Sequence, residues 1–397
     1  MIELDTLNET QQDSTFVKIK IIGVGGAGGN TVNSMISSGI DGVDFVVANS
    51  DMQALRQSKA VCKIQLGVKA TKGLGCGANP EVGRRATEED LERIMEQIGD
   101  ADIVFIVAGM GGGTGSGGAP VIAKALKDRG ILSIAVVTKP FAFEGKRRMI
   151  VAQEALDQLK KDVDTLIIVP NEKLLTLVDR SVSMIDSFEM INQLLMQSIK
   201  SVSSIISRSG HINVDFADLR AIMKGMGLAM MGTGSASGHN RAVEAAKKAI
   251  SSQLLENMDI KSARGVLMNI CGGPDLSLHE INDAANVIYD ESNKDAHIIL
   301  GSVIDPSMGD EVVVSVVATG FSPVAAQVPV EKIMPSVAQP KPEEKRIMQH
   351  EPQLARVMVE RNDFAQSDSL EIPAYLRKQD PSNHGADHGM DQGVDGQ

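Results

Sequence analysis

Short apolar runs separated by helical patterns dominate the first part of the chain. The runs occupy residues 17–25, 43–49, 101–109, 131–138 and 164–170. They lack strict alternation of apolar and polar positions, which is typical of parallel strands covered on both faces. Helical patterns lie between them, for example at 88–98 and 119–129. This order predicts an α/β fold with a doubly wound parallel sheet.

A long helical pattern without glycine, at 183–208, leads into a second α/β unit. Strands of this unit are expected at 228–234, 263–273, 297–305 and 311–320, and helices at 240–255 and 276–292. After Gly320 the chain becomes rich in proline and mixed charges, which is typical of a flexible linker. An apolar island at 370–378 and an acidic tail follow.

Composition and charge narrow the classes of function. The net charge of −12 argues against a general nucleic-acid-binding protein, which needs a basic face. Cys62, Cys76 and Cys271 have neither the number nor the spacing of a disulfide framework or a zinc site. The N-terminus does not have the pattern of a signal peptide, and no apolar stretch approaches the roughly 20 residues that span a bilayer. We therefore expect a soluble cytoplasmic protein without direct membrane insertion.

Two glycine clusters each follow a predicted strand and precede a helix. Residues 23–28 match G-x-G-x-x-G, the dinucleotide fingerprint, although a tight turn without a ligand also explains such a match. In the second cluster, 109–118, seven of ten residues are glycine. Successive amides there could surround a phosphate, with the hydroxyls of Thr114 and Ser116 as further donors, or the segment could be a flexible loop. Neither a P-loop nor a nucleophile elbow matches.

A third glycine-rich segment, 72–80, either covers a terminal phosphate or is a surface loop. Together with a later acidic motif, the order G-G-A-G-G-N, G-L-G-C-G-A-N-P, G-G-G-T-G-S-G and N-V-D-F-A-D resembles FtsZ, the family of bacterial tubulin-like division GTPases. The resemblance runs from about residue 17 to 320 and returns at 370–378. It implies a tubulin-like fold with a GTP-binding domain, a central helix, a smaller C-terminal α/β domain and a disordered tail.

The resemblance also implies the organisation of the chain. We expect an N-terminal arm at 1–15, a GTP-binding domain at 16–182, a connecting helix at 183–208, a C-terminal activation and polymerisation domain at 209–320, a linker at 321–369, a partner-binding peptide at 370–378 and an acidic tail at 379–397. The peptide resembles the one by which the family binds membrane-tethering partners such as FtsA, although by itself it could be a random apolar patch. We have no account of the tail.

The nucleotide contacts are implied residue by residue. Glycines and Asn30 of the first cluster would line the α- and β-phosphates, the second cluster would hold the β- and γ-phosphates, and 75–78 would lie over the γ-phosphate. Glu144, Arg148 and Asn171 would contact the ribose and phosphates, and Phe188 and Asn192 the guanine. The full set is Gly26, Ala27, Gly28, Gly29, Asn30, Gly75, Cys76, Gly77, Ala78, Gly113, Thr114, Gly115, Glu144, Arg148, Asn171, Phe188 and Asn192. Without the family, Phe188 would be a core residue and Arg148 a solvated charge.

The acidic motif supplies the expected catalytic residues, Asp215 and Asp218, with Asn213 supporting their loop. Sixteen residues of helix separate Asn192 from Arg208, which is about 24 Å. The two carboxylates therefore cannot readily reach the GTP of their own subunit, and they would serve the next subunit of a head-to-tail filament. Mg²⁺ would be held through the phosphates rather than by protein ligands. The other interpretation is that the two Asp residues cap the following helix, and both roles are compatible because a cap fixes a carboxylate in place.

Two departures from the family pattern and two competing functions remain. Cys76 stands where relatives more often have Ala or Ser, and Asn192 where many have Asp. A Rossmann oxidoreductase would use the 23–28 fingerprint with Asp51 on the ribose. A nucleotide-binding scaffold that polymerises but hydrolyses GTP slowly is the other alternative. The family function is a ring of filaments at mid-cell that binds GTP, hydrolyses it to GDP and recruits other division proteins.

Overall fold

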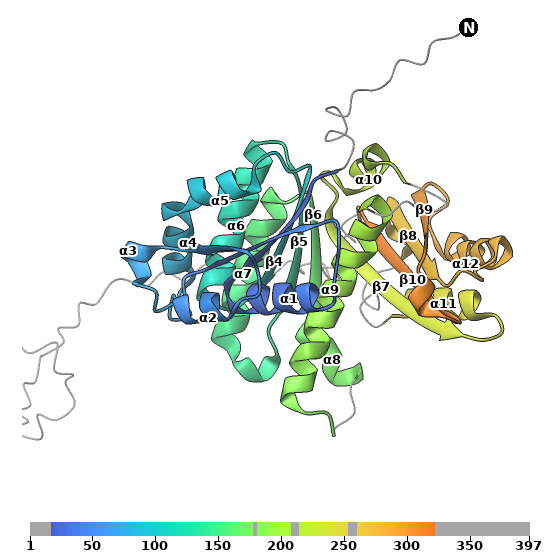
Figure 1. The fold of residues 1–397 in the computed structure, drawn as a ribbon, viewed down its shortest axis with the longest axis horizontal. Helices are drawn as coiled ribbons and strands as arrows, with labels where there is room; N and C mark the ends of the chain where they lie inside the picture. Colours follow the sequence, from blue (N-terminus) through green and yellow to red (C-terminus); the bar gives the residue numbers. More distant parts are fainter. Residues whose placement is uncertain (1–16, 178–180, 208–213, 253–259, 322–397) are drawn as a thin grey trace, which may run out of the picture. The chain divides into compact units, whose positions relative to one another are not determined.

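The computed structural model describes residues 17–177, 181–207, 214–252 and 260–321. Within these residues, ten strands form one sheet in the order β3-β2-β1-β4-β5-β6-β7-β10-β8-β9 (Figure 1). The strands are β1 (Ile19–Val24), β2 (Asp44–Asn49), β3 (Cys62–Gln65), β4 (Ile103–Gly109), β5 (Leu132–Lys139), β6 (Thr165–Pro170), β7 (Gly227–Ser237), β8 (Gly265–Gly272), β9 (His297–Ile304) and β10 (Glu311–Thr319).

All nine predicted strands are present, with bounds within three residues of those expected. The sheet contains one further strand, β3, which was not predicted. It has four residues, and only one of them, Ile64, is buried. The strands from β3 to β7 in the sheet order are parallel, as expected for the doubly wound half. In the second half, β10 is antiparallel to β7 and β8, while β8 and β9 are parallel.

The two halves share the sheet because β6 pairs with β7. This pairing covers three residues, Thr165 to Ile167 opposite Gly227 to Ala229. The sequence predicted two α/β units, and it contains no signal for which strands meet between them. A short parallel pairing far apart in the chain depends on tertiary packing rather than on a local pattern.

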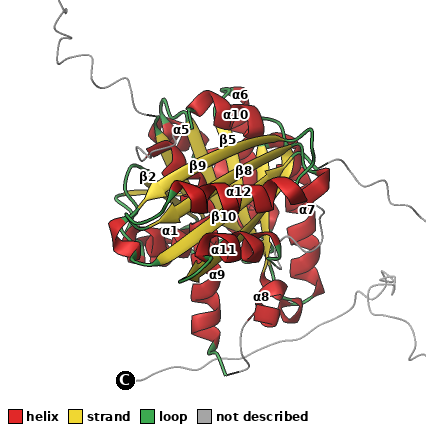
Figure 2. Cartoon of the chain, turned by 90° about the vertical axis from the view of Figure 1, so that its right-hand side faces the viewer, coloured by secondary structure: helices red, strands yellow, loops and turns green. Residues whose placement is uncertain are grey.

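Helices cover both faces of the sheet (Figures 1 and 2). They are α1 (Gly25–Ser37), α2 (Met52–Gln57), α3 (Val68–Thr71), α4 (Pro80–Glu89), α5 (Leu91–Ile98), α6 (Gly113–Asp128), α7 (Lys146–Asp162), α8 (Asn171–Leu177), α9 (Met184–Ser207), α10 (Phe216–Met223), α11 (Arg241–Ile250) and α12 (Leu278–Glu291). Side chains of α1, α9 and α10 share one hydrophobic core, and those of α5, α6 and α7 share the core on the opposite face. In the described segments, no helix combines the length and apolar character required to cross a bilayer.

The long helix α9 holds the two halves together. Its buried side chains recur three or four residues apart, so they form one stripe. They are Ile191, Leu195, Ile199, Val202 and Ile205. This stripe belongs to a core that also contains residues of β5, β6, β8, β9 and β10. Full burial of each such side chain stabilises the folded state by roughly 1.5–3 kcal/mol relative to exposure. Helix α9 is therefore packed firmly against the sheet and is not a flexible linker.

The glycines of the second cluster are largely helical. Helix α6 begins at Gly113, six residues before the predicted start at 119, and it packs backbone to backbone against α4. A Cβ atom on Gly117 would lie 2.1 Å from the carbonyl oxygen of Pro80, and one on Gly83 would lie 2.2 Å from that of Gly113. These distances leave no room for a methyl group, so much of the glycine content serves close helix packing.

A buried arginine organises the second half of the chain. Arg241 at the start of α11 is 4% exposed and donates from Nε to Glu280 Oε1 at 2.8 Å. Its Nη1 lies 2.9 Å from Asp275 Oδ2 and 2.8 Å from Asp310 Oδ1. The hydrogen bond from Arg241 lowers the pKa of Glu280 from 4.5 to about 2. Asp275 and Asp310 are more than half exposed, so Arg241 is the buried member of this network. Removing a carboxylate partner is costly because the buried charge of Arg241 is then less well paired.

Gly117→Ala is expected to destabilise the protein by about 1–3 kcal/mol, because the added methyl group must displace α4. Gly26→Ala is the matched control, since it also adds a methyl group within a helix but has no atom within 4 Å of the new Cβ. Urea unfolding of the nucleotide-free variants, followed by circular dichroism, measures both. Equal midpoints for the two variants would contradict the close-packing account.

Glu280→Gln is expected to lower the free energy of unfolding by about 2 kcal/mol at pH 7, because the negative charge opposite the Arg241 guanidinium is lost and the remaining hydrogen bond is weaker. A depressed folded-state pKa stabilises the protein above the unfolded value of 4.5, and this contribution is lost as the pH falls toward about 2. The difference between wild type and variant should therefore shrink over that window. Glu244→Gln, at an exposed pair with Lys247, should change stability by less than about 1 kcal/mol at either pH. A difference that stays constant with pH would refute the linkage.

Candidate functional site

A cavity of about 470 Å³ opens where β1 and β4 end and α1 and α6 begin. These strands are neighbours in the sheet, yet their following helices pack on opposite faces. Such a switch point is where open α/β sheets bind ligands. The cavity is lined by Val24, Gly25, Gly26, Ala27, Asn30, Thr31, Gly109, Met110, Gly112, Gly113, Thr114, Gly115, Thr138, Pro140, Glu144, Arg148, Asn171, Phe188, Ile191, Asn192 and Leu195.

Two helix N-termini face this cavity. Neither α1 nor α6 has a side-chain cap on its first turn, and neither carries an acidic residue there. The free N–H groups and the positive ends of both helix dipoles therefore favour an anion between them. Gly26 and Gly112 have no atom within 4 Å of a built Cβ, so the backbone is open to a ligand at these two positions.

Other glycines of the same clusters serve packing instead. A Cβ on Gly28 would lie 2.3 Å from the Val107 carbonyl oxygen, and one on Gly115 would lie 2.5 Å from that of Gly109. Glycine at these positions lets α1 and α6 approach the strands closely enough to aim their N-termini into the cavity. The fingerprint at 23–28 therefore combines close packing with ligand access.

One end of the cavity carries an aromatic ring and amide side chains. Phe188 is 40% exposed and meets Phe141 edge to face, with ring centroids 5.8 Å apart, so it is not a core residue. Asn192 accepts a hydrogen bond from Thr31 Oγ1 at 3.1 Å and donates to Glu189 at 3.2 Å. Asn171 Oδ1 is buried and has no hydrogen-bond partner within the described structure. A buried acceptor without a partner is costly unless a ligand satisfies it.

Charged groups border the same cavity. Arg148 donates to Glu144 Oε2 at 2.6 Å, and Glu144 Oε1 accepts from the Phe141 amide at 2.9 Å. The Arg148 side chain is half exposed, and it lines both this cavity and an adjoining one of about 270 Å³. Gly77, Ala78, Gly111, Arg147 and Val151 complete the adjoining cavity. A guanidinium held by a carboxylate at this point suits recognition of an anionic group.

The structure brings most of the predicted nucleotide residues together. Gly28, Gly29, Gly75 and Cys76 do not line either cavity. Thr31, Thr138 and Pro140 also line the cavity and were not among the predicted contacts, and Gly112 was predicted only as part of the cluster 109–118. Thr31 and Gly112 are next to predicted residues in the sequence. Thr138 and Pro140 lie at the carboxyl end of β5, where sheets of this kind bind ligands, so the predicted strand could have indicated them.

The acidic pair lies elsewhere. Asp215 and Asp218 are exposed at the start of α10, and Figure 1 shows α10 at the top of the view and α8, which begins with Asn171, at the bottom. Fifteen residues of α9 separate Asn192 from Ser207, which is about 22 Å. Asp215 Oδ1 accepts from the Asp218 amide at 2.7 Å, so Asp215 caps α10, whereas Asp218 lies within the helix. The alternative in which both Asp residues cap the helix is therefore confirmed for Asp215 alone. Asn213 and the peptide 370–378 lie outside the described residues.

The structure does not support the role of Asp51 as the ribose-binding residue of a Rossmann oxidoreductase. Asp51 Oδ1 accepts from the Gln53 amide at 2.8 Å, and it caps α2. Asp51 does not line the cavity. An acidic residue that recognises a ribose would have to face the ligand.

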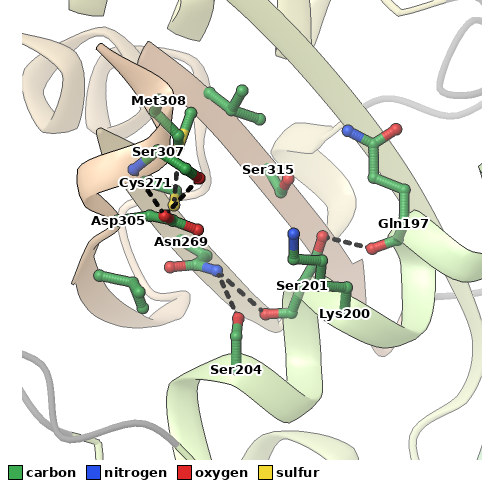
Figure 3. A pocket seen from close by; sticks show the side chains of 12 residues that line it. Gln197, Lys200, Ser201, Ser204, Asn269, Cys271, Asp305, Ser307, Met308 and Ser315 are labelled. Carbon is green, nitrogen blue, oxygen red and sulfur yellow. Dashed lines mark hydrogen bonds between the residues drawn. The ribbon is translucent and has the colours of Figure 1, made fainter. Parts of the chain in front are cut away.

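A separate cavity, of about 220 Å³, lies between α9 and strands β8 to β10 (Figure 3). Asn269 points into it and donates to Ser204 Oγ at 3.1 Å, and Ser201 donates to the Gln197 carbonyl at 2.7 Å. Cys271 Sγ lies 3.2 Å from Met308 Sδ. The lining of this cavity comes from α9, from β8 to β10 and from residues 305–308. It offers amides, hydroxyls, sulfur and the charged side chains of Lys200 and Asp305, but no paired helix N-termini.

Two family models match the chain. Residues 18–179 match the GTPase domain of the tubulin/FtsZ family, and residues 227–322 match the C-terminal domain of the FtsZ family. Among solved structures, an FtsZ dimer from M. jannaschii is 42% identical, with a TM-score of 0.74, covering 78% of this chain and 89% of that chain.

More distant structures share the fold. CetZ2 from Haloferax volcanii, solved as a GTPγS-bound protofilament, is 24% identical with a TM-score of 0.66, covering 77% of this chain and 94% of that one. CetZ1 from the same organism, solved as a GDP-bound monomer, is 24% identical with a TM-score of 0.68 and covers 78% of this chain and 96% of that one. With both domains matched in order and 42% identity to an FtsZ over most of its length, this chain belongs to the FtsZ proteins of the tubulin/FtsZ family of GTPases.

Proposed function

We propose that the chain binds GTP in the cavity between α1 and α6, assembles head to tail, and hydrolyses GTP at the junction between subunits. The observation that carries this proposal is the separation of the anion-binding cavity from Asp215 and Asp218 by most of α9. A site with its phosphate cradle at one end and its acids at the other is completed only when two subunits meet end to end.

The cavity supplies the binding half of this site. The N-termini of α1 and α6 suit the phosphate chain, with Thr114 as a hydroxyl donor to it. Arg148 adds a cation, and the unpartnered oxygen of Asn171 suits a ribose hydroxyl. Phe188 and Asn192 at the other end suit a base, by stacking and by hydrogen bonds to its edge.

The acids supply the hydrolytic half. The cap fixes the Asp215 carboxylate through Oδ1, and its second oxygen can accept a proton from water. Asp218 lies one turn along on the same exposed face, and Asn213 would support the loop before it. A junction that joins unlike ends does not close on itself, so repeating it produces a filament.

Mg²⁺ fits this site only through the nucleotide. No group of three or more His, Cys, Asp or Glu in the described segments could hold a metal ion. Phosphate oxygens are the hard ligands that Mg²⁺ prefers, and the ion neutralises charge on the β- and γ-phosphates when bound. The chain's own contribution is to orient the phosphate chain with backbone amides.

The cellular part of the proposal rests on the family. Filaments of this chain would form the division ring in the cytoplasm beneath the inner membrane at mid-cell. Residues 370–378 would bind a tethering protein such as FtsA and recruit other division proteins. The support is the apolar and basic sequence of that segment after a long linker, which suits a short motif that folds on contact.

Asp215→Asn is expected to lower GTP turnover by about 100-fold or more, because the charge that activates water is lost. Asn is as good an N-cap as Asp, so this variant separates catalysis from helix stability. Phosphate release with Mg²⁺ is measured over a range of protein concentrations. In the wild type, turnover should be negligible below a threshold and rise linearly above it.

Adding an equal amount of Asp215→Asn to the wild type should lower wild-type turnover, because mixed junctions contain a defective acid. Turnover per subunit that is independent of concentration would show that one chain contains the complete site. That result would refute the proposal that a neighbouring subunit completes the site. It would not contradict GTP binding in the cavity.

Asn171→Leu is expected to weaken GTP binding about tenfold while leaving the nucleotide-free protein at least as stable as the wild type. The substitution removes a ligand contact and also removes a buried acceptor without a partner. Fluorescent GTP titration and urea unfolding measure the two effects. NADH is the control ligand and should not bind; NADH binding would revive the oxidoreductase alternative.

A further inference from the structure

Three side chains form a closed hydrogen-bonded ring directly behind the N-terminus of α6. Ser50 Oγ lies 2.7 Å from Thr114 Oγ1, Cys76 Sγ lies 3.1 Å from Ser50 Oγ, and Thr114 Oγ1 lies 3.4 Å from Cys76 Sγ. Ser50 follows β2 and is fully buried, and Cys76 is 8% exposed. Of the three, only Thr114 lines the cavity.

Counting protons gives the ring a direction. Each group has one hydrogen to donate. Cys76 donates to Ser50 and Thr114 donates to Cys76, so the hydrogen of Ser50 is directed to Thr114 Oγ1. The Ser50 hydroxyl thus occupies one lone pair of Thr114 and leaves the Thr114 hydrogen on the other side.

The acceptor of the Thr114 hydrogen is the weakest in the ring, because thiol sulfur is a poorer acceptor than a hydroxyl oxygen. At 3.4 Å it is also the longer of the two contacts that the sulfur makes. A phosphate oxygen in the cavity would be a far stronger acceptor, because hydrogen bonds to ionised groups are about twice as strong as neutral ones. Donation from Ser50 polarises the Thr114 hydroxyl and makes it a better donor in turn.

The ring is held firmly by its surroundings. The Ser50 carbonyl accepts from the Gly75 amide at 3.2 Å and from Thr71 Oγ1 at 3.3 Å. A Cβ on Gly113 would lie 2.6 Å from Cys76 Cβ, so the thiol packs directly against the start of α6. The two residues behind Thr114 therefore have little freedom to move when a ligand binds.

We propose that Ser50 is a positioning residue for nucleotide binding, which directs the Thr114 hydroxyl toward the phosphate chain, and that Cys76 is a weak resting acceptor that releases this hydroxyl when the nucleotide enters. The proposal rests on the proposed function, in which Thr114 contacts the β- and γ-phosphates. Ser50 acts through Thr114, so its effect on affinity depends on the Thr114 hydroxyl.

A double-mutant cycle tests this dependence. GTP affinity is measured by competition with fluorescent GTP, at protein concentrations below the threshold for turnover, for Ser50→Ala, Thr114→Val and the double variant. Ser50→Ala should weaken GTP binding about three- to tenfold, and Thr114→Val at least as much. In the Thr114→Val background, Ser50→Ala should cause no further loss, because there is no hydroxyl left to orient.

Two further variants separate the hydroxyl from packing. Ser50→Thr keeps the hydroxyl and should retain GTP affinity within about threefold. Cys76→Ala removes the weak acceptor of the Thr114 hydrogen and the weak thiol donor to Ser50, while the hydroxyls of Ser50 and Thr114 stay in contact, so it should retain GTP affinity within about twofold. Thermal unfolding of the nucleotide-free variants reports any loss of structure separately from affinity.

The outcomes distinguish this inference from the proposed function. If Ser50→Ala has no effect, or weakens GTP binding equally in both Thr114 backgrounds, Ser50 is not a positioning residue, although the nucleotide site stands. If Cys76→Ala weakens binding as much as Ser50→Ala does, the resting-acceptor role of Cys76 is wrong. If Thr114→Val binds GTP like the wild type, the assignment of Thr114 to the phosphates fails, and the inference fails with it.

Discussion

The structure depends on two helices that begin side by side at the carboxyl ends of the neighbouring strands β1 and β4, with unsatisfied backbone amides. Neither α1 nor α6 caps its first turn with a side chain, so an anion is the natural partner for both. This arrangement needs glycine for two separate reasons. Gly28 and Gly115 let the helices approach the strands, while Gly26 and Gly112 leave the backbone open to a ligand. Stability and binding thus draw on the same short segments.

Helix α9 fixes the position of the cavity relative to α10. Its apolar stripe packs against both halves of the continuous sheet, which fixes the distance between the cavity and α10. Asp215 caps α10, and the same hydrogen bond that stabilises the helix orients the carboxylate. Under the proposed function, a rigid connection of this kind couples hydrolysis to the junction between subunits, because neither end can move toward the other within one chain.

Sequence patterns and structure disagree in instructive places. The predicted helix at 119–129 begins at Gly113, because close packing against α4 outweighs the low helix propensity of glycine. Strand β3 has too few buried positions to produce a periodic signal. Cys76, expected over the γ-phosphate, lies buried behind Gly113 in contact with Ser50, and its contact with a nucleotide stays a prediction.

The sequence by itself determined the elements with strong local signals: nine strands, the long helix α9 and the glycine clusters at the ends of β1 and β4. Apolar periodicity and residue-specific backbone preferences act over a few residues, so they can be recognised without the fold. Tertiary structure alone decided the pairing of β6 with β7, the division of the glycines between packing and ligand access, the unpartnered oxygen of Asn171 and the ring formed by Ser50, Cys76 and Thr114. Each of these depends on groups distant in the chain meeting at a few ångströms, a distance that no local pattern encodes.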